Sequence, residues 1–350
     1  MRIAHILPSI DHCGPNLIAR GIVNNLPASV EVSVLYFRHS GDLSFKNEAQ
    51  LLRFPYYGQL NDFDLVHTHM FKPDMLAYLS NKHIWVSTVH TDIAEDFKHK
   101  FAKSPTKRLL FTKLWQKAIS KADCAVFLTE FHRRKYLSGY DANTTVINNG
   151  LSFEDASIGG DSQILKHLKQ LKEQGKTILG NSCRVVSGKA IDQVMNFLAE
   201  SVDNIHFVLF GDGSHLEQLK QIAKSLSIDS KISFMGNVDR ASMYYRYFDF
   251  FLFTSYTEGL PVSLIEAASS AIPVICSDLP PIREIFDENE ICYFTNNDLI
   301  SLKNAFIKAQ ANQMSYANNI KSAYEKKLTA SVMSNKYFEL YTHLLNKNKI

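Results

Sequence analysis

Residues 254–285, TSYTEGLPVSLIEAASSAIPVICSDLPPIREI, place a polar loop, a short helix and an apolar strand in direct succession. Two carboxylates in this stretch, Glu258 and Glu266, lie eight residues apart. The Gly-Leu-Pro turn between them predicts the start of a helix, with Pro261 in the first turn, where proline is favoured. Backbone N–H groups at a helix start lack partners within the helix and can face an anion. The stretch therefore favours a binding site for a nucleotide sugar.

A pair of basic residues follows an expected strand at 177–179. Arg184 and Lys189 lie five residues apart in the segment CRVVSGK, residues 183–189. Two cations on one loop can clamp a diphosphate, because charge-assisted hydrogen bonds to phosphate oxygens are strong. The alternative is two solvated cations at the surface, which becomes the weaker interpretation beside the glutamate pair.

Two glycine turns follow further expected strands. Gly211 lies in the segment FGDGS, residues 210–214, and a second loop, MGNV, ends at Val238. A tight turn that needs a positive φ explains such glycines as well as contact with a ligand does. The first turn lacks the third glycine of a dinucleotide-binding fingerprint, which argues against that function.

Together these motifs resemble the donor-binding signature of the retaining glycosyltransferases of family 4, which are two-domain enzymes of the GT-B type. The resemblance rests on the spacing of the glutamates, the Glu-Gly-Leu-Pro turn and the Pro-Val-Ile strand that follows. It implies that Glu258 contacts hydroxyls of the donor sugar and that Glu266 holds the ribose. It also implies that Arg184 and Lys189 neutralise the diphosphate and stabilise the leaving nucleotide. The other donor-binding residues that it implies are Gly211, Val238, Gly259, Leu260 and Pro261.

The sequence departs from the family pattern at three alanines. Ala190 stands where the family usually has Gly after the lysine, and Ala268 stands where it has Met. Ala271 replaces the Gly that precedes the strand proline. We expect the changes at Ala268 and Ala271 to alter helix packing without removing the site.

Two residues of the first half match the family less closely. Gly14 follows the first expected strand in DHCGPN, residues 11–16, where the family has a Gly-Gly loop near the diphosphate and the acceptor. Pro15 replaces the second glycine and has no N–H to donate, so only Gly14 is assigned to this loop. His90 ends an expected strand, where the family has a His that faces the reactive sugar carbon. Ligands of open α/β sheets bind at such strand ends, so we expect His90 to orient the sugar or stabilise charge, although a solitary His is more often structural.

Length and pattern predict two domains. A chain of 350 residues exceeds what one core usually supports, and short β-branched or aromatic runs alternate with helix-like segments, as in parallel βαβ units. The expected fold class is α/β of the GT-B type, with two Rossmann-like doubly wound domains facing a central cleft.

Residues 1–155 form the expected acceptor-binding domain and residues 165–330 the donor-binding domain. A helix at 331–350 packs back on the first domain, and a polar linker at 154–161 joins the two. The expected strands are 3–7, 30–36, 65–67, 85–90, 125–128, 145–147, 177–179, 206–210, 232–234, 250–253 and 274–276.

Two short motifs suggest a metal, but each has a stronger alternative. His67 and His69 lie close in sequence, yet no acidic or cysteine partner follows them at metal-ligand spacing. Asp62 and Asp64 form an Asp-x-Asp pattern like the metal motif of the other major glycosyltransferase fold. Because this pattern directly precedes an expected strand, a strand-entry loop explains it better. We therefore expect no metal and no cofactor other than the donor substrate.

Positive charge is concentrated in one segment. Residues 97–122 contain eight Lys or Arg and no acid, whereas the net charge is only +3, too small to indicate nucleic-acid binding. We expect a helix at 106–122. Its apolar side is expected to contain Leu110, Leu114, Trp115 and Ala118. The segment at 98–121 is a solvated helix face, a peripheral contact with anionic lipid, or a surface for an acidic oligosaccharide.

The compartment is expected to be the cytoplasm. Five scattered cysteines without a Cys-x-x-Cys pair indicate reduced thiols. The first apolar run is too short for a signal peptide, and no run reaches the ~20 residues of a membrane-spanning helix. A position at the inner face of the membrane is the alternative, through the basic segment alone.

The sequence thus predicts a retaining glycosyltransferase that moves a hexosyl or N-acetylhexosaminyl group to a saccharide or lipid-linked saccharide acceptor. By resemblance alone, UDP is the expected carrier and bacterial surface polysaccharide the expected product. A GDP-mannose-dependent mannosyltransferase is the runner-up. A GT-B epimerase, a non-catalytic nucleotide-sugar binding protein, and a module that binds nucleic acid or membrane through the basic helix remain alternatives. The last of these leaves the glutamate motif unexplained.

Overall fold

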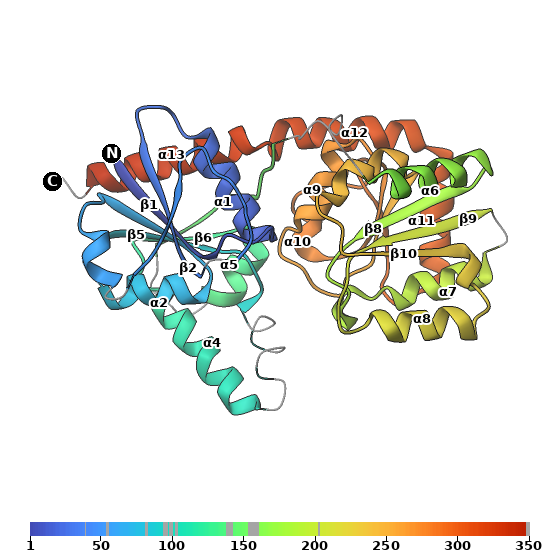
Figure 1. The fold of residues 1–350 in the computed structure, drawn as a ribbon, viewed down its shortest axis with the longest axis horizontal. Coiled ribbons are helices and arrows are strands. Elements are labelled where there is room, and N and C mark those ends of the chain that lie inside the picture. The colour runs from blue at the N-terminus through green and yellow to red at the C-terminus, as the bar shows by residue number, and fades with distance from the viewer. Residues whose placement is uncertain are drawn as a thin grey trace. The chain divides into compact units, whose positions relative to one another are not determined.

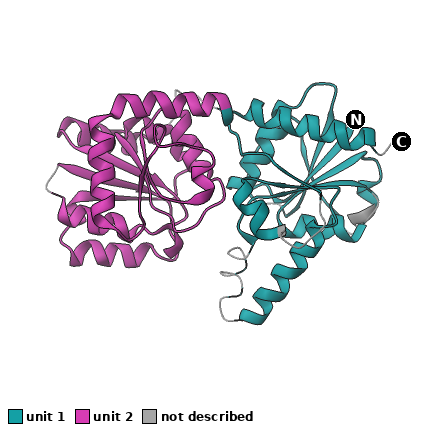
Figure 2. Cartoon of the chain, turned by 180° about the vertical axis from the view of Figure 1, so that it is seen from behind, with its two compact units in different colours: residues 1–152, 327–350 teal, residues 153–326 magenta. Residues whose placement is uncertain are grey.

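The computed structural model divides the chain into two compact units (Figures 1 and 2). Unit 1 comprises Met1–Ser152 and Lys327–Ile350, and unit 2 comprises Phe153–Lys326. The structure describes residues 1–38, 40–53, 56–80, 83–93, 97, 101, 104–137, 143–152, 161–201 and 204–347. The expected linker at 154–161 lies outside these residues except for its last position, as do Lys98, Lys100 and Lys103 of the basic segment.

Unit 1 is built on a parallel sheet of seven strands in the order β3-β2-β1-β4-β5-β6-β7. The strands are β1 (Arg2–Ser9), β2 (Glu31–Arg38), β3 (Ala49–Leu51), β4 (Leu65–His69), β5 (Ile84–Val89), β6 (Cys124–Phe127) and β7 (Thr144–Val146). The helices are α1 (Gly14–Asn25), α2 (Phe71–Ser80), α4 (Pro105–Ile119), α5 (Glu130–Leu137) and α13 (Ala330–Lys347). Because the strand order reverses beside β1, this is a doubly wound, Rossmann-like sheet.

Unit 2 repeats the pattern with six parallel strands in the order β10-β9-β8-β11-β12-β13. The strands are β8 (Thr177–Ser182), β9 (Ile205–Phe210), β10 (Ile232–Gly236), β11 (Phe250–Phe253), β12 (Val274–Ser277) and β13 (Cys292–Phe294). The helices are α6 (Ser162–Glu173), α7 (Asp192–Glu200), α8 (Leu216–Ser225), α9 (Val262–Ser269), α10 (Pro280–Arg283), α11 (Leu299–Ala311) and α12 (Gln313–Lys327). Every strand that the sequence predicts is present, and β3 and β13 are additional.

Strand alternation in unit 1 separates two buried polar clusters. Along β4, His67 and His69 point to the face of the sheet that α13 covers, where Tyr341 bonds to His67. Thr68 points to the opposite face, where its hydroxyl donates to Asp74 of α2. Successive side chains of a strand face opposite ways, so one strand serves both clusters.

The Asp74 carboxylate joins both α2 and α4 to the sheet. It accepts hydrogen bonds from the hydroxyls of Thr68 (2.5 Å) and Ser87 (2.8 Å) and from the indole nitrogen of Trp115 (2.6 Å). Burial raises its pKa to about 7, in spite of these three donors. The indole of Trp115 is fully buried here and anchors α4.

The apolar side of α4 differs from the expectation. Trp115 and Ala118 are buried, but Leu110 and Leu114 are 63% and 36% exposed. The expected single stripe is therefore wrong: the buried side is Trp115, Ala118 and Ile119, and the leucines lie outside it. None of the described helices is both long and apolar enough to cross a membrane.

The last helix, α13, packs against α1 within unit 1. The hydroxyl of Ser334 donates to the carbonyl of Ile22 at 2.9 Å, and Met333, Tyr337 and Tyr341 are buried. Gly150, just before the end of the first segment of unit 1, donates its amide to the sulfur of Met333 at 3.1 Å. These contacts explain why the chain returns to unit 1 after residue 327.

Candidate functional site

Two loops of unit 2 meet where the parallel strands β8 and β11 end. Arg184 and Lys189 follow β8, and Glu258 follows β11. The hydroxyl of Thr254 donates to the carbonyl of Lys189 at 2.8 Å, and the amide of Tyr256 donates to the carbonyl of Gly188 at 2.9 Å. The backbone therefore fixes the basic loop beside the glutamate loop at the edge where such sheets bind ligands.

Lys189 and Glu258 form an ion pair inside this site. Their Nζ and Oε1 atoms lie 2.5 Å apart, with the side chains 24% and 12% exposed. Burial alone would lower the pKa of Lys189, but the Glu258 carboxylate outweighs it, and the pKa lies above its usual value. Lys189 is thus not a solvated surface cation, whereas Arg184 is exposed.

Glu266 lies on α9, partly buried, on the same unit. Burial raises the pKa of the Tyr245 hydroxyl, and the nearby negative charge of Glu266 raises it further. Gly259 is partly exposed, and Leu260 is buried and anchors the turn. The helix begins at Val262, with Pro261 as the N-cap residue in extended conformation. The expected place of Pro261 in the first turn is therefore wrong by one position, because its ψ of 136° is not helical.

The Gly-Asp-Gly turn after β9 packs tightly against the basic loop. Gly211 has a φ of 127°, and a Cβ there would lie 1.8 Å from the carbonyl oxygen of Cys183. The amide of Val185 donates to the carbonyl of Asp212 at 2.9 Å. The structure thus requires glycine at 211 for the turn itself. Val238 lies just beyond the end of β10 and is partly exposed.

Both alanines of unit 2 that replace a family glycine have left-handed backbone. Ala190 has a φ of 51° and Ala271 a φ of 56°. Alanine in this region costs roughly 1–2 kcal/mol, which glycine avoids. Both positions thus have the left-handed conformation that glycine favours, although they carry alanine. The two alanines differ in burial, because Ala190 is fully buried and Ala271 is partly exposed.

Replacing Ala271 with glycine is expected to stabilise unit 2 by about 0.5–1 kcal/mol, since relief of backbone strain exceeds the cost in unfolded-state entropy. Ala190→Gly is the matched variant. It also loses a buried methyl group worth about 0.8 kcal/mol, so its free energy of unfolding should change little. Urea unfolding followed by circular dichroism measures both, and equal effects would contradict the explanation.

Gln193 on α7 is a positioning residue that sequence reasoning missed. Its amide nitrogen donates to the carbonyl of Thr254 (3.1 Å) and to Asn296 (2.8 Å), and its amide oxygen accepts from the amide of Asn297 (2.6 Å). It holds the start of the glutamate loop to the segment after β13. No local pattern marks it, because its partners are about 60 and 100 residues away.

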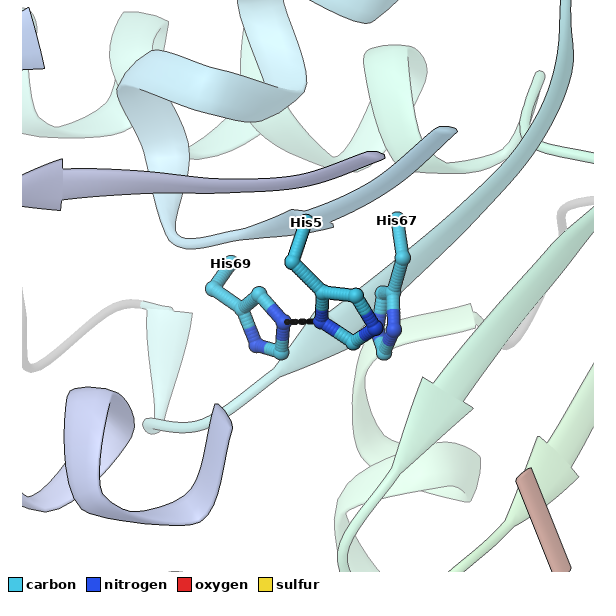
Figure 3. Close-up of side chains that lie close together, drawn as sticks. All are labelled: His5, His67 and His69. Atoms are coloured by element: carbon cyan, nitrogen blue, oxygen red, sulfur yellow. Dashed lines mark hydrogen bonds between the residues drawn. The ribbon is translucent and has the colours of Figure 1, made fainter. Parts of the chain in front are cut away.

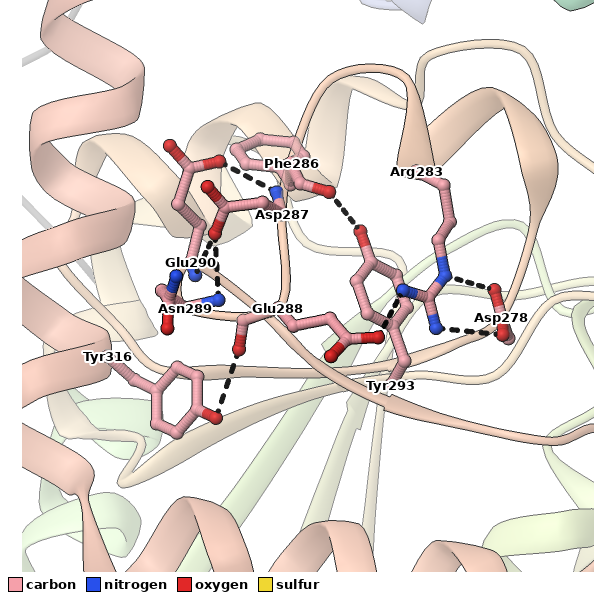
Figure 4. Close-up of polar contacts among 9 residues, drawn as sticks. All are labelled: Asp278, Arg283, Phe286, Asp287, Glu288, Asn289, Glu290, Tyr293 and Tyr316. Carbon is pink, nitrogen blue, oxygen red and sulfur yellow. Dashed lines mark hydrogen bonds and ion pairs between the residues drawn. The ribbon is translucent and has the colours of Figure 1, made fainter.

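The end of the quoted stretch forms a surface network around Arg283 (Figure 4). Its guanidinium donates twice to Asp278, at 2.7 and 3.0 Å, and once to Glu288 at 2.7 Å. It also lies 4.2 Å from the ring centre of Tyr293, whose hydroxyl donates to the carbonyl of Phe286. Arg283 thus ties the loop after β12 to β13 and has a structural role.

In unit 1, the two expected site residues follow the carboxyl ends of β1 and β5, which β4 separates in the sheet. Gly14 is the first residue of α1, so the expectation that it lies in the preceding loop is wrong by one position. The N-cap is Cys13, and Pro15 fits the first turn because it needs no N–H there. His90 follows β5 and is 8% exposed.

His90 belongs to a cluster of four buried histidines. Strand pairing places His5 of β1 opposite His67 of β4, and His69 lies two residues further along β4. Figure 3 shows the three rings side by side, with His5 Nδ1 and His69 Nε2 3.1 Å apart. His69 Nδ1 lies 2.8 Å from His90 Nε2. No local sequence pattern marks His5, because it joins the cluster only through the pairing of β1 with β4.

The three histidines of Figure 3 each offer a nitrogen within 4.8 Å of the others, so their spacing alone would admit a metal. Both nitrogens of His67 are already bonded, to Tyr341 (2.6 Å) and to Thr88 (2.7 Å). Both nitrogens of His5 and of His69 also have partners. A zinc site needs lone pairs directed at one point, and this cluster uses them in hydrogen bonds.

The Asp-x-Asp pattern before β4 is a strand-entry loop. The carboxylate of Asp64 accepts from the amide of Arg2 at 2.7 Å, and the amide of Asp64 donates to the carbonyl of Arg2 at 2.8 Å. Asp64 therefore aligns β4 with β1, and Asp62 is exposed in the turn before it.

Two doubly wound Rossmann-like units are the architecture of the GT-B type of glycosyltransferase. The family model described as Glycosyl transferases group 1 matches residues 163–336, and the one described as Glycosyltransferase Family 4 matches residues 17–155. The chain belongs to the family 4 glycosyltransferases, as the motifs predicted.

A curated relative and two solved structures are similar to this chain over nearly its whole length. The O-antigen biosynthesis glycosyltransferase WclY of Escherichia coli is 24% identical, over 99% of each chain. HepE of Anabaena, solved with UDP and glucose, has a TM-score of 0.79 at 14% identity and covers 98% of this chain and 100% of its own. Sucrose-phosphate synthase of Thermosynechococcus elongatus has a TM-score of 0.78 at 16% identity over 99% of each chain.

Proposed function

We propose that this glycosyltransferase is a retaining enzyme that transfers a hexosyl or N-acetylhexosaminyl group from a UDP-sugar to a saccharide or lipid-linked saccharide. The observation that carries the proposal is the partly buried Lys189–Glu258 pair at the ends of β8 and β11. A cation and a carboxylate within one site suit a diphosphate and the sugar hydroxyls attached to it.

In this proposal each unit 2 residue has one task. Lys189 and the exposed Arg184 bind the diphosphate, Glu258 accepts hydrogen bonds from sugar hydroxyls, and Glu266 accepts from the ribose. Gly211 and Val238 line the nucleotide, and the turn of Gly259, Leu260 and Pro261 lies against it. Unit 1 binds the acceptor, with Gly14 near the diphosphate and His90 near the anomeric carbon.

The reaction breaks the bond between the anomeric carbon and the diphosphate oxygen, and the electron pair leaves with the diphosphate. The acceptor hydroxyl attacks from the same face, and its proton passes to an oxygen of the departing phosphate. Lys189 and Arg184 stabilise the growing charge, each charge-assisted bond contributing about 1.5–3 kcal/mol. These two cations serve where other enzymes use a metal ion, so we propose metal-independent transfer.

Two similar proteins support the proposed donor and the proposed biological role. HepE was solved with UDP and glucose, and WclY is an O-antigen biosynthesis glycosyltransferase. We therefore propose a UDP-sugar donor, with GDP-mannose as the runner-up, and a role in assembling bacterial surface polysaccharide in the cytoplasm. An epimerase and a non-catalytic binding protein are the other outcomes of the test below.

The test is thermal stabilisation of the purified protein by UDP-glucose, UDP-galactose, UDP-N-acetylglucosamine, UDP-N-acetylgalactosamine and GDP-mannose, with EDTA present. A donor at 100 times its Kd should add about 2.7 kcal/mol to the free energy of unfolding, and Glu266→Ala should weaken this effect. No shift with any donor at millimolar concentration would contradict the donor site. Incubation with the active donor alone separates transfer from epimerisation, since only an epimerase yields an isomeric nucleotide sugar.

The described part of the basic segment, which includes all of α4, supports a peripheral membrane contact. Leu109, Leu110 and Leu114 are 57%, 63% and 36% exposed, beside the exposed cations Lys113 and Lys117. Exposed leucines among cations suit an anionic lipid surface, whereas an acidic oligosaccharide has no use for the leucines.

We expect the protein to float with vesicles that contain phosphatidylglycerol and not with vesicles of phosphatidylcholine alone. The double variant Leu109→Ser, Leu110→Ser should lose most of this binding. Leu226→Ser is the matched control, because Leu226 is an exposed leucine of unit 2 (38%) outside the basic segment. Equal flotation of both variants would contradict the membrane contact.

A further inference from the structure

The carboxylate of Glu258 lies beside the cation that the proposed function assigns to the diphosphate. Its Oε1 atom is 2.5 Å from Nζ of Lys189, and its side chain is 12% exposed, against 24% for the lysine. The carboxylate is thus the deeper member of the pair, and solvent ions screen its charge less. A ligand that binds to Lys189 is therefore also close to a negative charge.

Backbone contacts hold the two charges together. The hydroxyl of Thr254 donates to the carbonyl of Lys189 at 2.8 Å, and the amide of Tyr256 donates to the carbonyl of Gly188 at 2.9 Å. The loop that ends at Glu258 is therefore tied at two points to the loop that carries Lys189. Its backbone stays beside Lys189 when an anion binds there.

The spacing of the pair limits how far a bound phosphate can lie from the carboxylate. A phosphate oxygen that accepts a hydrogen bond from a lysine lies about 2.8 Å from the nitrogen. Because Nζ of Lys189 is itself 2.5 Å from Oε1 of Glu258, that phosphate oxygen lies within about 5.3 Å of the carboxylate. Two negative charges this close repel each other in a partly buried site.

The donor and the product of the proposed reaction differ at this phosphate. In a nucleotide sugar the outer phosphate carries one negative charge, and the hydroxyls of the attached sugar can donate to a carboxylate. In the free nucleoside diphosphate the same phosphate has lost the sugar and carries nearly two charges at pH 7.5, because its second pKa is about 6. Transfer therefore adds a negative charge near Glu258 and removes the hydroxyls that donate to it.

We propose that Glu258 makes the site selective for the nucleotide sugar over the nucleoside diphosphate that the reaction produces. The inference rests on the proposed function, in which Lys189 binds the diphosphate and Glu258 accepts from the sugar hydroxyls. The same carboxylate then strengthens binding of the substrate through hydrogen bonds and weakens binding of the product through charge repulsion. Release of product limits the rate of many enzymes, so this selectivity favours turnover.

A role for Glu258 as a counter-ion alone is the competing explanation. A counter-ion would compensate the charge of Lys189 and would oppose the binding of every anionic ligand alike. Its neutralisation would then change the affinities for donor and product by the same factor. The ratio of the two dissociation constants, and not either constant by itself, separates the two explanations.

The test is isothermal titration calorimetry of the wild type and of Glu258→Gln with UDP and with each UDP-sugar that stabilises the wild type, at pH 7.5 with EDTA. Glutamine has the shape of glutamate without its charge, so the Kd for UDP should fall about tenfold, which corresponds to about 1.4 kcal/mol. The Kd for the UDP-sugar should rise about threefold, because an amide accepts weaker hydrogen bonds from the hydroxyls than a carboxylate does. An unchanged ratio, or weaker binding of UDP, would overturn the proposal.

Two further substitutions at the same position separate charge from contact. Glu258→Asp keeps the negative charge on a shorter side chain, so its Kd for UDP should stay within about twofold of the wild-type value while binding of the UDP-sugar weakens. Glu258→Ala removes the charge and should tighten UDP as Glu258→Gln does, which gives a second measurement if the glutamine variant does not fold. Equal binding of UDP by the aspartate variant and the uncharged variants would overturn the repulsion.

Glu200→Gln is the matched control for the loss of one negative charge from unit 2. Glu200 ends α7 and pairs with Lys303 at 2.8 Å, and its side chain is 60% exposed. Both Kd values should therefore be those of the wild type. If Glu200→Gln tightened UDP as much as Glu258→Gln, net charge would explain the effect and the proposal would be wrong.

The titrations distinguish failure of this inference from failure of the proposed function. If the UDP-sugars bind and Glu258→Gln leaves the ratio unchanged, only the inference is overturned. If neither UDP nor any UDP-sugar binds to the wild type or to the variants at millimolar concentration, the proposed function is contradicted, and the inference is overturned with it.

Discussion

Lys189→Met is expected to lower kcat by about 100-fold or more, in line with the loss of one preorganised charged donor to a leaving group. The substitution is also expected to lower the stability of unit 2, which replacement of a surface lysine would not do. In the variant Glu258, which is 12% exposed, loses the cation that lies 2.5 Å from it. Removal of one partner of a buried pair leaves an uncompensated charge and costs about 3–5 kcal/mol at full burial, so a smaller loss of stability is expected here.

The matched control is Lys172→Met in the same unit. Lys172 also forms an ion pair, with Asp249 at 2.6 Å, but its side chain is 37% exposed and lies on α6, away from the strand ends that hold the site. Its loss should cost less than about 1 kcal/mol and leave kcat unchanged. Equal kinetics for Lys189→Met and Lys172→Met would contradict the assignment of Lys189 to the diphosphate.

Restoring the charge balance sharpens the comparison. In the double variant Lys189→Met, Glu258→Gln, an uncharged amide of the same shape replaces the carboxylate. No unpaired charge is then left in the site, so stability should return toward that of the wild type. Activity should not return, because both the phosphate cation and the sugar acceptor are then missing. Recovery of kcat in the double variant would show that Lys189 acts only to neutralise Glu258.

The sequence predicted the parts of this protein whose signal is local. Aromatic and β-branched runs located the strands, and the Glu-Gly-Leu-Pro turn located the glutamate loop. It missed β3 and β13, which are three residues long and too short to show alternation. It placed Leu110 on the buried side of α4 because helical spacing alone does not distinguish a core stripe from an exposed one.

The parts that it missed depend on which strands are neighbours. His5 and His67 are 62 residues apart and become partners only because β1 pairs with β4 across the reversal of strand order. Gln193 reaches Thr254 and Asn297 in the same way, from another element. A family pattern can mark such residues one at a time, but their joint geometry needs the fold.

Acidification from pH 7.5 to pH 5 is expected to destabilise unit 1 by roughly 5 kcal/mol. The four clustered histidines, His5, His67, His69 and His90, have folded-state pKa values below the unfolded value of about 6.5, chiefly through burial. The unfolded chain therefore binds more protons than the folded one below pH 6.5, and stability falls as the pH drops. At about 1.4 kcal/mol per pH unit, each histidine contributes roughly 2 kcal/mol by pH 5.

Asp74 acts in the opposite direction and reduces the total. Burial raises its folded-state pKa to about 7, so between that value and its unfolded pKa the folded protein binds the extra proton. Acidification to pH 5 thus returns about 3 kcal/mol of the roughly 8 kcal/mol lost at the histidines. For a unit of this size the net change corresponds to a fall in Tm of about 10–20 °C.

Tryptophan fluorescence measures this change in unit 1 alone, because both tryptophans of the chain, Trp85 and Trp115, are buried there. His67→Asn should flatten the pH dependence by about 40%, since it removes about 2 of the net 5 kcal/mol, although it lowers Tm at pH 7.5. His343→Asn, at an exposed position of α13, should leave both the slope and Tm unchanged. A Tm that stays constant from pH 7.5 to pH 5 would mean that the four clustered histidines accept protons in the folded state, and their assignment as neutral rings would then be wrong.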